Sequence, residues 1–189
     1  VISSPGFKDW LPNYNNLVLN HNTQISSMDK LESAEQLLLD KNKIKISYIG
    51  SIRDYKLNIN FINSLKNNEK FELLYHGNGH VNKHIQMFLK ENNIKNVSMT
   101  GTYNKADERG LYLNSDLINV LIPNDNINSR TLLPNRLYKA VIYGKPLIAI
   151  KGTYLSELIR EYKLGFIVDS VQNIEMKIID YLKKFDLAI

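Results

Sequence analysis

Glycine and cationic residues follow the first short apolar stretch of the chain. Gly50 comes directly after the run 44–49, and Arg53 and Lys56 follow shortly afterwards. A glycine lets an anionic ligand approach the backbone, an arginine makes two-pronged contacts with phosphate oxygens, and a lysine offers a point charge. The pattern predicts a site for a phosphate-bearing ligand, with a solvated, charged turn as the alternative interpretation.

Histidines and glycines occur together after the second apolar run, where residues 76–80 read HGNGH. Gly77 belongs to a glycine pair that lacks the third glycine of the dinucleotide-binding fingerprint. His76, His80 and His84 recur every four residues, a spacing that suits metal chelation on a helix. No carboxylate or fourth ligand accompanies them, so we expect no metal and interpret His76 as a hydrogen-bond donor to the ligand.

Two further loops complete the predicted site. The third apolar run ends at Gly101, Thr102 and Tyr103, which offer backbone groups and an aromatic face to a base, or form a plain turn. After the fourth run comes a long polar segment, 123–131, and long loops at strand ends are usually functional. Pro134 suits the first turn of a helix whose free N–H groups bind an anion and whose cap is Ser129 or Thr131. We expect ligand contacts around this helix start from Ser129, Arg130, Thr131, Leu132, Asn135 and Lys139.

Alternating strands and helices must position these loops. Apolar stripes at helical spacing run from Val81 to Leu89, Leu133 to Val141, Leu155 to Tyr162 and Ile174 to Leu182. Between them lie six short runs that are mostly apolar on both faces, typical of a sheet covered on both sides: Ile44 to Ile49, Phe71 to Tyr75, Val97 to Met99, Leu117 to Ile122, Pro146 to Ile150 and Gly165 to Val168. This alternation predicts an α/β fold with a doubly wound, parallel, Rossmann-like sheet over residues 44–189.

Residues 1–43 do not follow this alternation. Pro5, Gly6 and Pro12 form turns, the run 17–19 suits an edge strand, and the stretch 28–40 has the pattern of a helix. We interpret residues 1–43 as an interdomain linker with a helix that packs on the core.

The composition is that of a globular protein. Hydrophobic residues make up 43% and charged residues 23% of the 189 residues, which excludes disordered and fibrous classes. No apolar run approaches the ~20 residues that a membrane-spanning helix needs, and the first residues lack the pattern of an export signal. The absence of cysteine excludes disulfides and thiolate metal sites and agrees with a cytoplasmic location.

The net charge of +5 suits a phosphate-bearing ligand, an anionic membrane face or nucleic acid, or reflects scattered surface lysines. The basic residues are spread out rather than clustered with aromatic residues. We therefore expect no nucleic-acid partner.

The order of several pieces carries a family resemblance. These pieces are Gly50 with Arg53, Gly77-Asn78-Gly79, Val97 to Gly101, Leu117 to Pro123, Leu137 to Ala140, Gly144-Lys145-Pro146, Glu157 and Gly165. They resemble the C-terminal, nucleotide-sugar-binding domain of retaining, group 1 type glycosyltransferases of the two-domain GT-B fold. Members of this kind often build capsular or other surface polysaccharide.

The resemblance implies a metal-independent and cofactor-free transfer of a sugar, such as a hexose, from a nucleoside diphosphate to a glycan or lipid-linked acceptor. Arg53 with Lys56 would be the catalytic cations that neutralise the departing diphosphate, and Gly101 to Tyr103 would hold the base. The stretch 2–7 is similar to the family's junction between domains. We therefore expect an N-terminal partner domain that holds most of the acceptor, without which this chain is inactive. The family resemblance also implies a cytoplasmic enzyme, with room for a peripheral contact at the inner face of the membrane.

Two residues depart from the family pattern. Lys139 stands where the family carries a glutamate that binds the ribose hydroxyls, and Thr131 stands where another glutamate is expected. A lysine cannot accept a hydrogen bond, so either Asn135 substitutes as the acceptor or donor affinity is reduced. Two alternatives stay open: a non-catalytic nucleotide-binding or regulatory module on the same fold, and half of a sugar-nucleotide epimerase, which would need an acid and base carboxylate pair that the sequence does not reveal.

Overall fold

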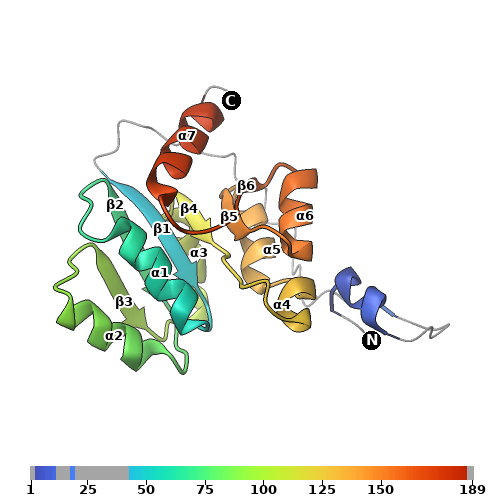
Figure 1. Cartoon of the computed structure of the whole chain (residues 1–189), viewed down its shortest axis with the longest axis horizontal. Helices are drawn as coiled ribbons and strands as arrows, with labels where there is room; N and C mark the ends of the chain where they lie inside the picture. Colours follow the sequence, from blue (N-terminus) through green and yellow to red (C-terminus); the bar gives the residue numbers. More distant parts are fainter. Residues whose placement is uncertain (1–2, 12–17, 20–42, 187–189) are drawn as a thin grey trace.

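A six-stranded parallel sheet forms the centre of the molecule (Figure 1). In this computed structural model, residues 3–11, 18–19 and 43–186 are described. The strand order is β3-β2-β1-β4-β5-β6, and every neighbouring pair is parallel. The strands are β1 (Ile44–Ile49), β2 (Phe71–His76), β3 (Val97–Gly101), β4 (Leu117–Asn119), β5 (Leu147–Ile150) and β6 (Gly165–Val168). The predicted α/β fold with a doubly wound sheet is confirmed.

Helices connect the strands, as right-handed crossovers between parallel strands require. The four stretches with apolar stripes all form helices, and further helices occupy the remaining crossovers and the β4 exit. The α-helices are α1 (Tyr55–Leu65), α2 (Asn82–Glu91), α3 (Glu108–Leu113), α4 (Ile127–Thr131), α5 (Asn135–Ile142), α6 (Tyr154–Glu161) and α7 (Ile174–Asp186), and the 3-10 helices are η1 (Pro5–Trp10) and η2 (Lys105–Asp107). Within the described ranges, no helix is long and apolar enough to cross a lipid bilayer.

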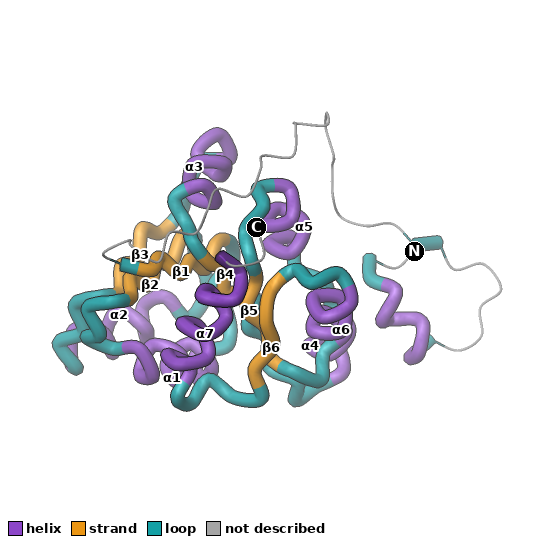
Figure 2. The backbone as a smooth tube through the Cα atoms, turned by 90° about the horizontal axis from the view of Figure 1, so that it is seen from above, coloured by secondary structure: helices purple, strands orange, loops and turns teal. Residues whose placement is uncertain are grey.

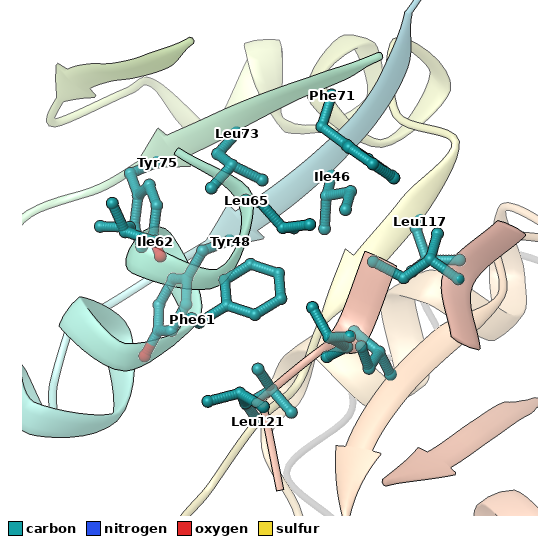
Figure 3. Close-up of a cluster of buried hydrophobic side chains, with 14 of the residues drawn as sticks. Ile46, Tyr48, Phe61, Ile62, Leu65, Phe71, Leu73, Tyr75, Leu117 and Leu121 are labelled. Carbon is teal, nitrogen blue, oxygen red and sulfur yellow. The ribbon is translucent and has the colours of Figure 1, made fainter. Parts of the chain in front are cut away.

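Helices pack on both faces of the sheet (Figure 2). On one face α1, α2 and α7 pack on the strands through a core that includes Ile46, Phe61 and Leu73 (Figure 3). On the other face α3, α5 and α6 pack through a core that includes Ile118 and Leu137. Burial on both sides explains why the central strands β4 and β5 are largely apolar, whereas the edge strand β3 exposes Ser98 and Thr100.

The strand order creates a switch point between β1 and β4. From β1 the chain proceeds through α1 to β2 and through α2 to β3, and it then crosses back to place β4 on the other side of β1. At such a point the loops leaving the two strands diverge, which opens a crevice at the carboxyl edge of the sheet. The β1 and β4 exits are therefore the loops to examine for a site.

The N-terminal segment packs beside this edge. Helix η1 lies next to α4 and α6 in Figure 1. The Ser4 hydroxyl accepts a hydrogen bond from the Gly6 N–H and donates one to the Thr131 carbonyl at the end of α4, at 2.5 Å. The expected edge strand at 17–19 includes two described residues, of which Leu19 forms a single bridge outside the six-stranded sheet. The helix expected over 28–40 lies outside the described residues.

Candidate functional site

The loops that leave β1, β2 and β3 are joined by backbone hydrogen bonds beyond the ends of the strands. The Gly50 N–H donates to the His76 carbonyl, and the Gly77 N–H donates to the Gly101 carbonyl, both at 2.8 Å. These bonds extend the pairing of the strands into the loops. The rim of the predicted site is therefore a continuation of the sheet, with little freedom to shift one loop without its neighbour.

Steric demands explain the glycines of this rim. A Cβ atom at Gly77 would lie 2.0 Å from the Gly50 carbonyl oxygen, and one at Gly79 would lie 1.9 Å from the Ile52 carbonyl oxygen. The glycine pair of the HGNGH segment thus permits close packing between two loops. At Gly50 and Gly101 an added Cβ would meet nothing within 4 Å, but their φ angles of 122° and 72° favour glycine.

The β1–α1 loop carries the two predicted catalytic cations. The Asn58 amide donates to the carbonyl oxygens of Arg53 and Asp54, and Asp54 adopts the left-handed conformation with φ 60°. The side chains of Arg53 and Lys56 are exposed. A buried amide therefore holds the loop in a strained turn while both cations face solvent, where an anion can reach them.

Electrostatic interactions show that the β1 exit lies close to the β4 exit and to the start of α5. Asp54 is exposed, yet partial desolvation raises the pKa of its carboxyl group, and the charge of Asp125 raises it further. The charges of Arg53, Arg136 and His80 oppose this rise. Residues from four separate segments thus act on one carboxyl group, which is the convergence expected at a switch point.

Arg136, in the first turn of α5, is the cation at the centre of this convergence. Its guanidinium carbon lies 3.7 Å from the centre of the Tyr48 ring, and the side chain is only 8% exposed. The Tyr48 hydroxyl in turn donates to the Ser51 carbonyl, which ties α5 to the β1 exit. The Arg136 Nε–H has no hydrogen-bond partner.

A buried donor on a charged group without a partner costs free energy, so its presence favours an anion as the absent acceptor. Sequence reasoning did not single out Arg136, because an arginine in the first turn of a helix usually points into solvent. The only local signal was its place directly after the predicted helix start.

The start of α5 differs from the prediction in one respect. Pro134 is the residue that precedes α5, and no side chain caps the helix. Ser129 and Thr131 instead belong to the short helix α4, where the Asn126 side chain accepts the hydrogen bond of the Ser129 N–H at 2.9 Å. The expectation that Ser129 or Thr131 caps α5 is therefore wrong, because both residues belong to α4, a separate short helix that precedes it. The first N–H groups of α5 have no side-chain cap, which leaves donors for an anion.

Lys139 and Tyr103, both predicted ligand residues, meet at a carboxylate that the sequence did not single out. The Lys139 Nζ lies 3.4 Å from the Glu108 Oε2, and both side chains are partly buried. Tyr103 is hydrogen-bonded to the same carboxylate. Burial first, then the Glu108 charge and this hydrogen bond, raise the pKa of Tyr103, while the charge of Arg136 lowers it. Lys139, Glu108 and Tyr103 therefore form one connected group, and the charge of Arg136 acts on it.

The three histidines do not converge on a metal. His76 is buried, and its Nδ1 lies 3.0 Å from the Thr100 Oγ1, whereas His84 packs edge-on against Tyr55 with ring centres 6.0 Å apart. Burial lowers the pKa of His76, so its ring is neutral at neutral pH. In the part of the chain that the structure describes, no group of three or more histidine or acidic side chains is placed to hold a metal ion.

The remaining predicted ligand residues lie around the same edge. Thr102, Arg130 and Asn135 are exposed, and Leu132 is partly buried against the core. Their roles stay predictions.

The sequence and the fold together identify the family. The model of the family "glycosyl transferases group 1" matches residues 29–187. The chain belongs to this family. No curated protein matches the chain.

Solved glycosyltransferase structures have a similar fold. Anabaena HepE in complex with UDP-glucose aligns with a TM-score of 0.57 and 15% identity, over 76% of this chain and 39% of that chain. A mutant of S. aureus TarM in complex with fondaparinux, α-GlcNAc-glycerol and UDP aligns with a TM-score of 0.62 and 16% identity, over 92% and 33%. The C-terminal domain of LpcC, a group 1 family protein of Francisella tularensis, aligns with a TM-score of 0.54 and 17% identity, over 76% and 74%.

These comparisons establish the Rossmann-like fold of GT-B glycosyltransferases for this group 1 chain. The chain spans less than half of the length of HepE and TarM.

Proposed function

We propose that this group 1 chain is the donor-binding domain of a glycosyltransferase that moves a sugar from a nucleoside diphosphate to a hydroxyl group of a glycan or lipid-linked acceptor. Membership of the family supports a transferase, and the complex of HepE with UDP-glucose supports a nucleotide-sugar donor. Residues 44–189 would form the donor-binding domain, and residues 1–43 would connect it to a partner domain that holds most of the acceptor. TarM, of which the chain covers 33%, is consistent with such a second domain.

The observation that carries this proposal is the position of Arg136. A buried, cationic side chain with an unpaired donor lies beside an uncapped helix start, at the point where the β1 and β4 loops diverge. Helix N-termini and arginine side chains both favour phosphate groups, and in open α/β sheets ligands bind at this point. A diphosphate there would supply the acceptor that the Arg136 Nε–H lacks.

In the proposed reaction, the bond between the anomeric carbon of the sugar and the diphosphate oxygen breaks. The acceptor oxygen bonds to the same carbon, the acceptor hydroxyl gives up its proton, and the nucleoside diphosphate leaves. Negative charge grows on the leaving oxygens as this happens. Arg136, Arg53 and Lys56 would stabilise that charge, and a fixed donor at such a place is worth roughly 3 kcal/mol.

Finer features follow the family resemblance and are part of this proposal. They are retention of the sugar's configuration, transfer of a hexose without a metal, a role in surface or capsular polysaccharide synthesis, and a cytoplasmic location with peripheral contact at the inner membrane face. The lack of cysteine is compatible with that location.

Calorimetric titration of the chain with UDP, GDP and ADP tests the proposal. We expect at least one of them to bind, and Arg136→Met to weaken its affinity about 10- to 100-fold through loss of a charged hydrogen bond. Arg160→Met, which removes an exposed arginine from the last turn of α6, is the matched control and should leave the affinity unchanged. Arg136→Lys keeps the charge but not the planar fork, and should bind with intermediate affinity.

Failure of all three nucleotides to bind, or equal affinity of Arg136→Met and the wild-type chain, would overturn the proposal. Transfer of the sugar distinguishes the enzyme from a non-catalytic nucleotide-binding module, which would bind the same nucleotides without turnover. An epimerase would instead change the sugar of the donor without any acceptor. The charges of Asp54 and Asp125 interact between the β1 and β4 exits, and they are the carboxylates that such a reaction would have to use.

A further inference from the structure

The carboxylate of Glu108 is held from two sides at the edge of the proposed nucleotide site. The Lys139 Nζ approaches one of its oxygens at 3.4 Å, and Tyr103 is hydrogen-bonded to it. Glu108 begins α3, directly after η2, which follows the loop that leaves β3, whereas Lys139 lies in α5. Two helices and a loop therefore meet at one acidic group, which keeps lone pairs beyond those that its two partners use.

The spacing along α5 relates this carboxylate to Arg136. Arg136 and Lys139 are three residues apart on the same helix, so their Cβ atoms are neighbours at roughly 5–6 Å. In a nucleoside diphosphate bound at Arg136, only the C5′ methylene group and one oxygen would separate the ribose ring from the diphosphate. The hydroxyl groups of that ribose would thus fall near the Lys139–Glu108 pair, and they are hydrogen-bond donors in need of acceptors.

We propose that Glu108 accepts the hydrogen bonds of the two ribose hydroxyls of the nucleotide, and that Lys139 positions its carboxylate. This inference rests on the proposed function, since it assumes a nucleotide at Arg136. A lysine offers three donors and no acceptor, so Lys139 cannot take this role itself. A carboxylate offers two oxygens to a pair of adjacent hydroxyls, the arrangement by which dinucleotide-binding folds hold ribose.

The ion pair also removes an electrostatic conflict. A lone carboxylate beside a diphosphate would repel it, and the repulsion would be strong in a partly buried site. The Lys139 ammonium neutralises Glu108 while leaving its remaining lone pairs available. The pair therefore supplies acceptor atoms for hydroxyl groups without a net negative charge.

A comparison of ribose with dideoxyribose isolates the contact. Of UDP, GDP and ADP, the one that binds most tightly is titrated together with its 2′,3′-dideoxy counterpart into the wild-type chain and into Glu108→Gln. We expect the wild-type chain to prefer the ribonucleotide by about tenfold or more, and Glu108→Gln to lose most of this preference. The ratio of the two affinities cancels any general effect of the changed charge on diphosphate binding.

Asp107→Asn is the matched control, because it removes one negative charge from an exposed neighbouring residue. Its preference for the ribonucleotide should equal that of the wild-type chain. If Glu108→Gln does not fold, the double variant Glu108→Gln with Lys139→Met removes both partners of the ion pair and is judged by the same ratio.

The outcomes separate the inference from the proposed function. Binding of no ribonucleotide to the wild-type chain refutes the proposed function and the inference with it. Tight binding in which the wild-type chain does not distinguish ribose from dideoxyribose, or in which Glu108→Gln retains the full preference, overturns the role of Glu108 alone.

Discussion

The same substitution, glycine to alanine, should have opposite effects on stability at Gly79 and Gly110. Neither glycine has a positive φ angle, so backbone strain does not distinguish them. At Gly79 the added Cβ would lie 1.9 Å from the carbonyl oxygen of Ile52, whereas real Cβ contacts essentially never fall below 3.0 Å. At Gly110, within α3, the added Cβ would meet nothing within 4 Å.

The magnitudes follow from these distances. The Gly79→Ala protein must move the Ile52 carbonyl by about 1 Å, and the obstacle is backbone rather than a flexible side chain. Overpacking of this kind costs about 1–3 kcal/mol or more, so we expect a loss of at least about 2 kcal/mol in the free energy of unfolding. Gly110→Ala relieves the entropic cost of a glycine in a helix and should stabilise the protein by about 0.5 kcal/mol.

Urea unfolding followed by far-UV circular dichroism measures both changes. Gly79→Ala should lower the midpoint at an unchanged slope, and Gly110→Ala should raise it. Because Arg53 follows Ile52 in the displaced loop, Gly79→Ala should also weaken nucleoside diphosphate binding, with Gly110→Ala as the control. An unaltered or higher midpoint for Gly79→Ala would show that the two loops are not packed as the structure has them.

Three further predictions concern buried polar groups. Burial lowers the pKa of His76 below its usual 6.5, so protonation of the unfolded state below that pH reduces the stability of the folded protein. His76→Gln should therefore lose less of its urea midpoint than the wild-type protein between about pH 7.5 and pH 5.5. An equal loss in the two proteins would contradict this. Tyr75→Phe removes a buried hydroxyl without a partner and should leave the stability equal or higher. Tyr48→Phe loses a 3.0 Å hydrogen bond to the Ser51 carbonyl and should cost about 1 kcal/mol. If thermal unfolding ranks the two variants in the reverse order, these hydrogen-bond assignments for Tyr75 and Tyr48 are wrong. Ser4→Ala, which loses the bond that joins η1 to α4, should destabilise by about 1–2 kcal/mol in the same assay, while the exposed Ser3 should tolerate alanine without effect.

The architecture of the sheet could be predicted from the sequence because its signals are local. Apolar runs and helical stripes are read within a few residues of each other, and the handedness of crossovers leaves few arrangements for their alternation. The ends of the elements are less certain. The run through Ile122 was predicted as strand, but β4 ends at Asn119, where the side-chain oxygen accepts the Leu121 N–H in place of a ladder bond. Apolarity does not reveal such a competing acceptor.

The loops of the site could also be placed from the sequence, because parallel strands direct their exits to one edge. The chemistry within them could not. The glycine pair at 77–79 suggested a ligand, yet the structure uses it to pack two loops together. Lys139 taken alone suggested a lost acceptor, and only the fold places Glu108 beside it.

By itself, then, the sequence determined the order of strands and helices along the chain. It also determined the edge of the sheet at which loops with glycines and cations would gather. Tertiary structure alone decided that Arg136 is buried against Tyr48 and that Lys139 shares a carboxylate with Tyr103. The physical reason is that helix and strand patterns depend on neighbours in the chain. Burial, ion pairing and an unpaired donor depend on residues that are distant in sequence and meet only when the sheet has formed.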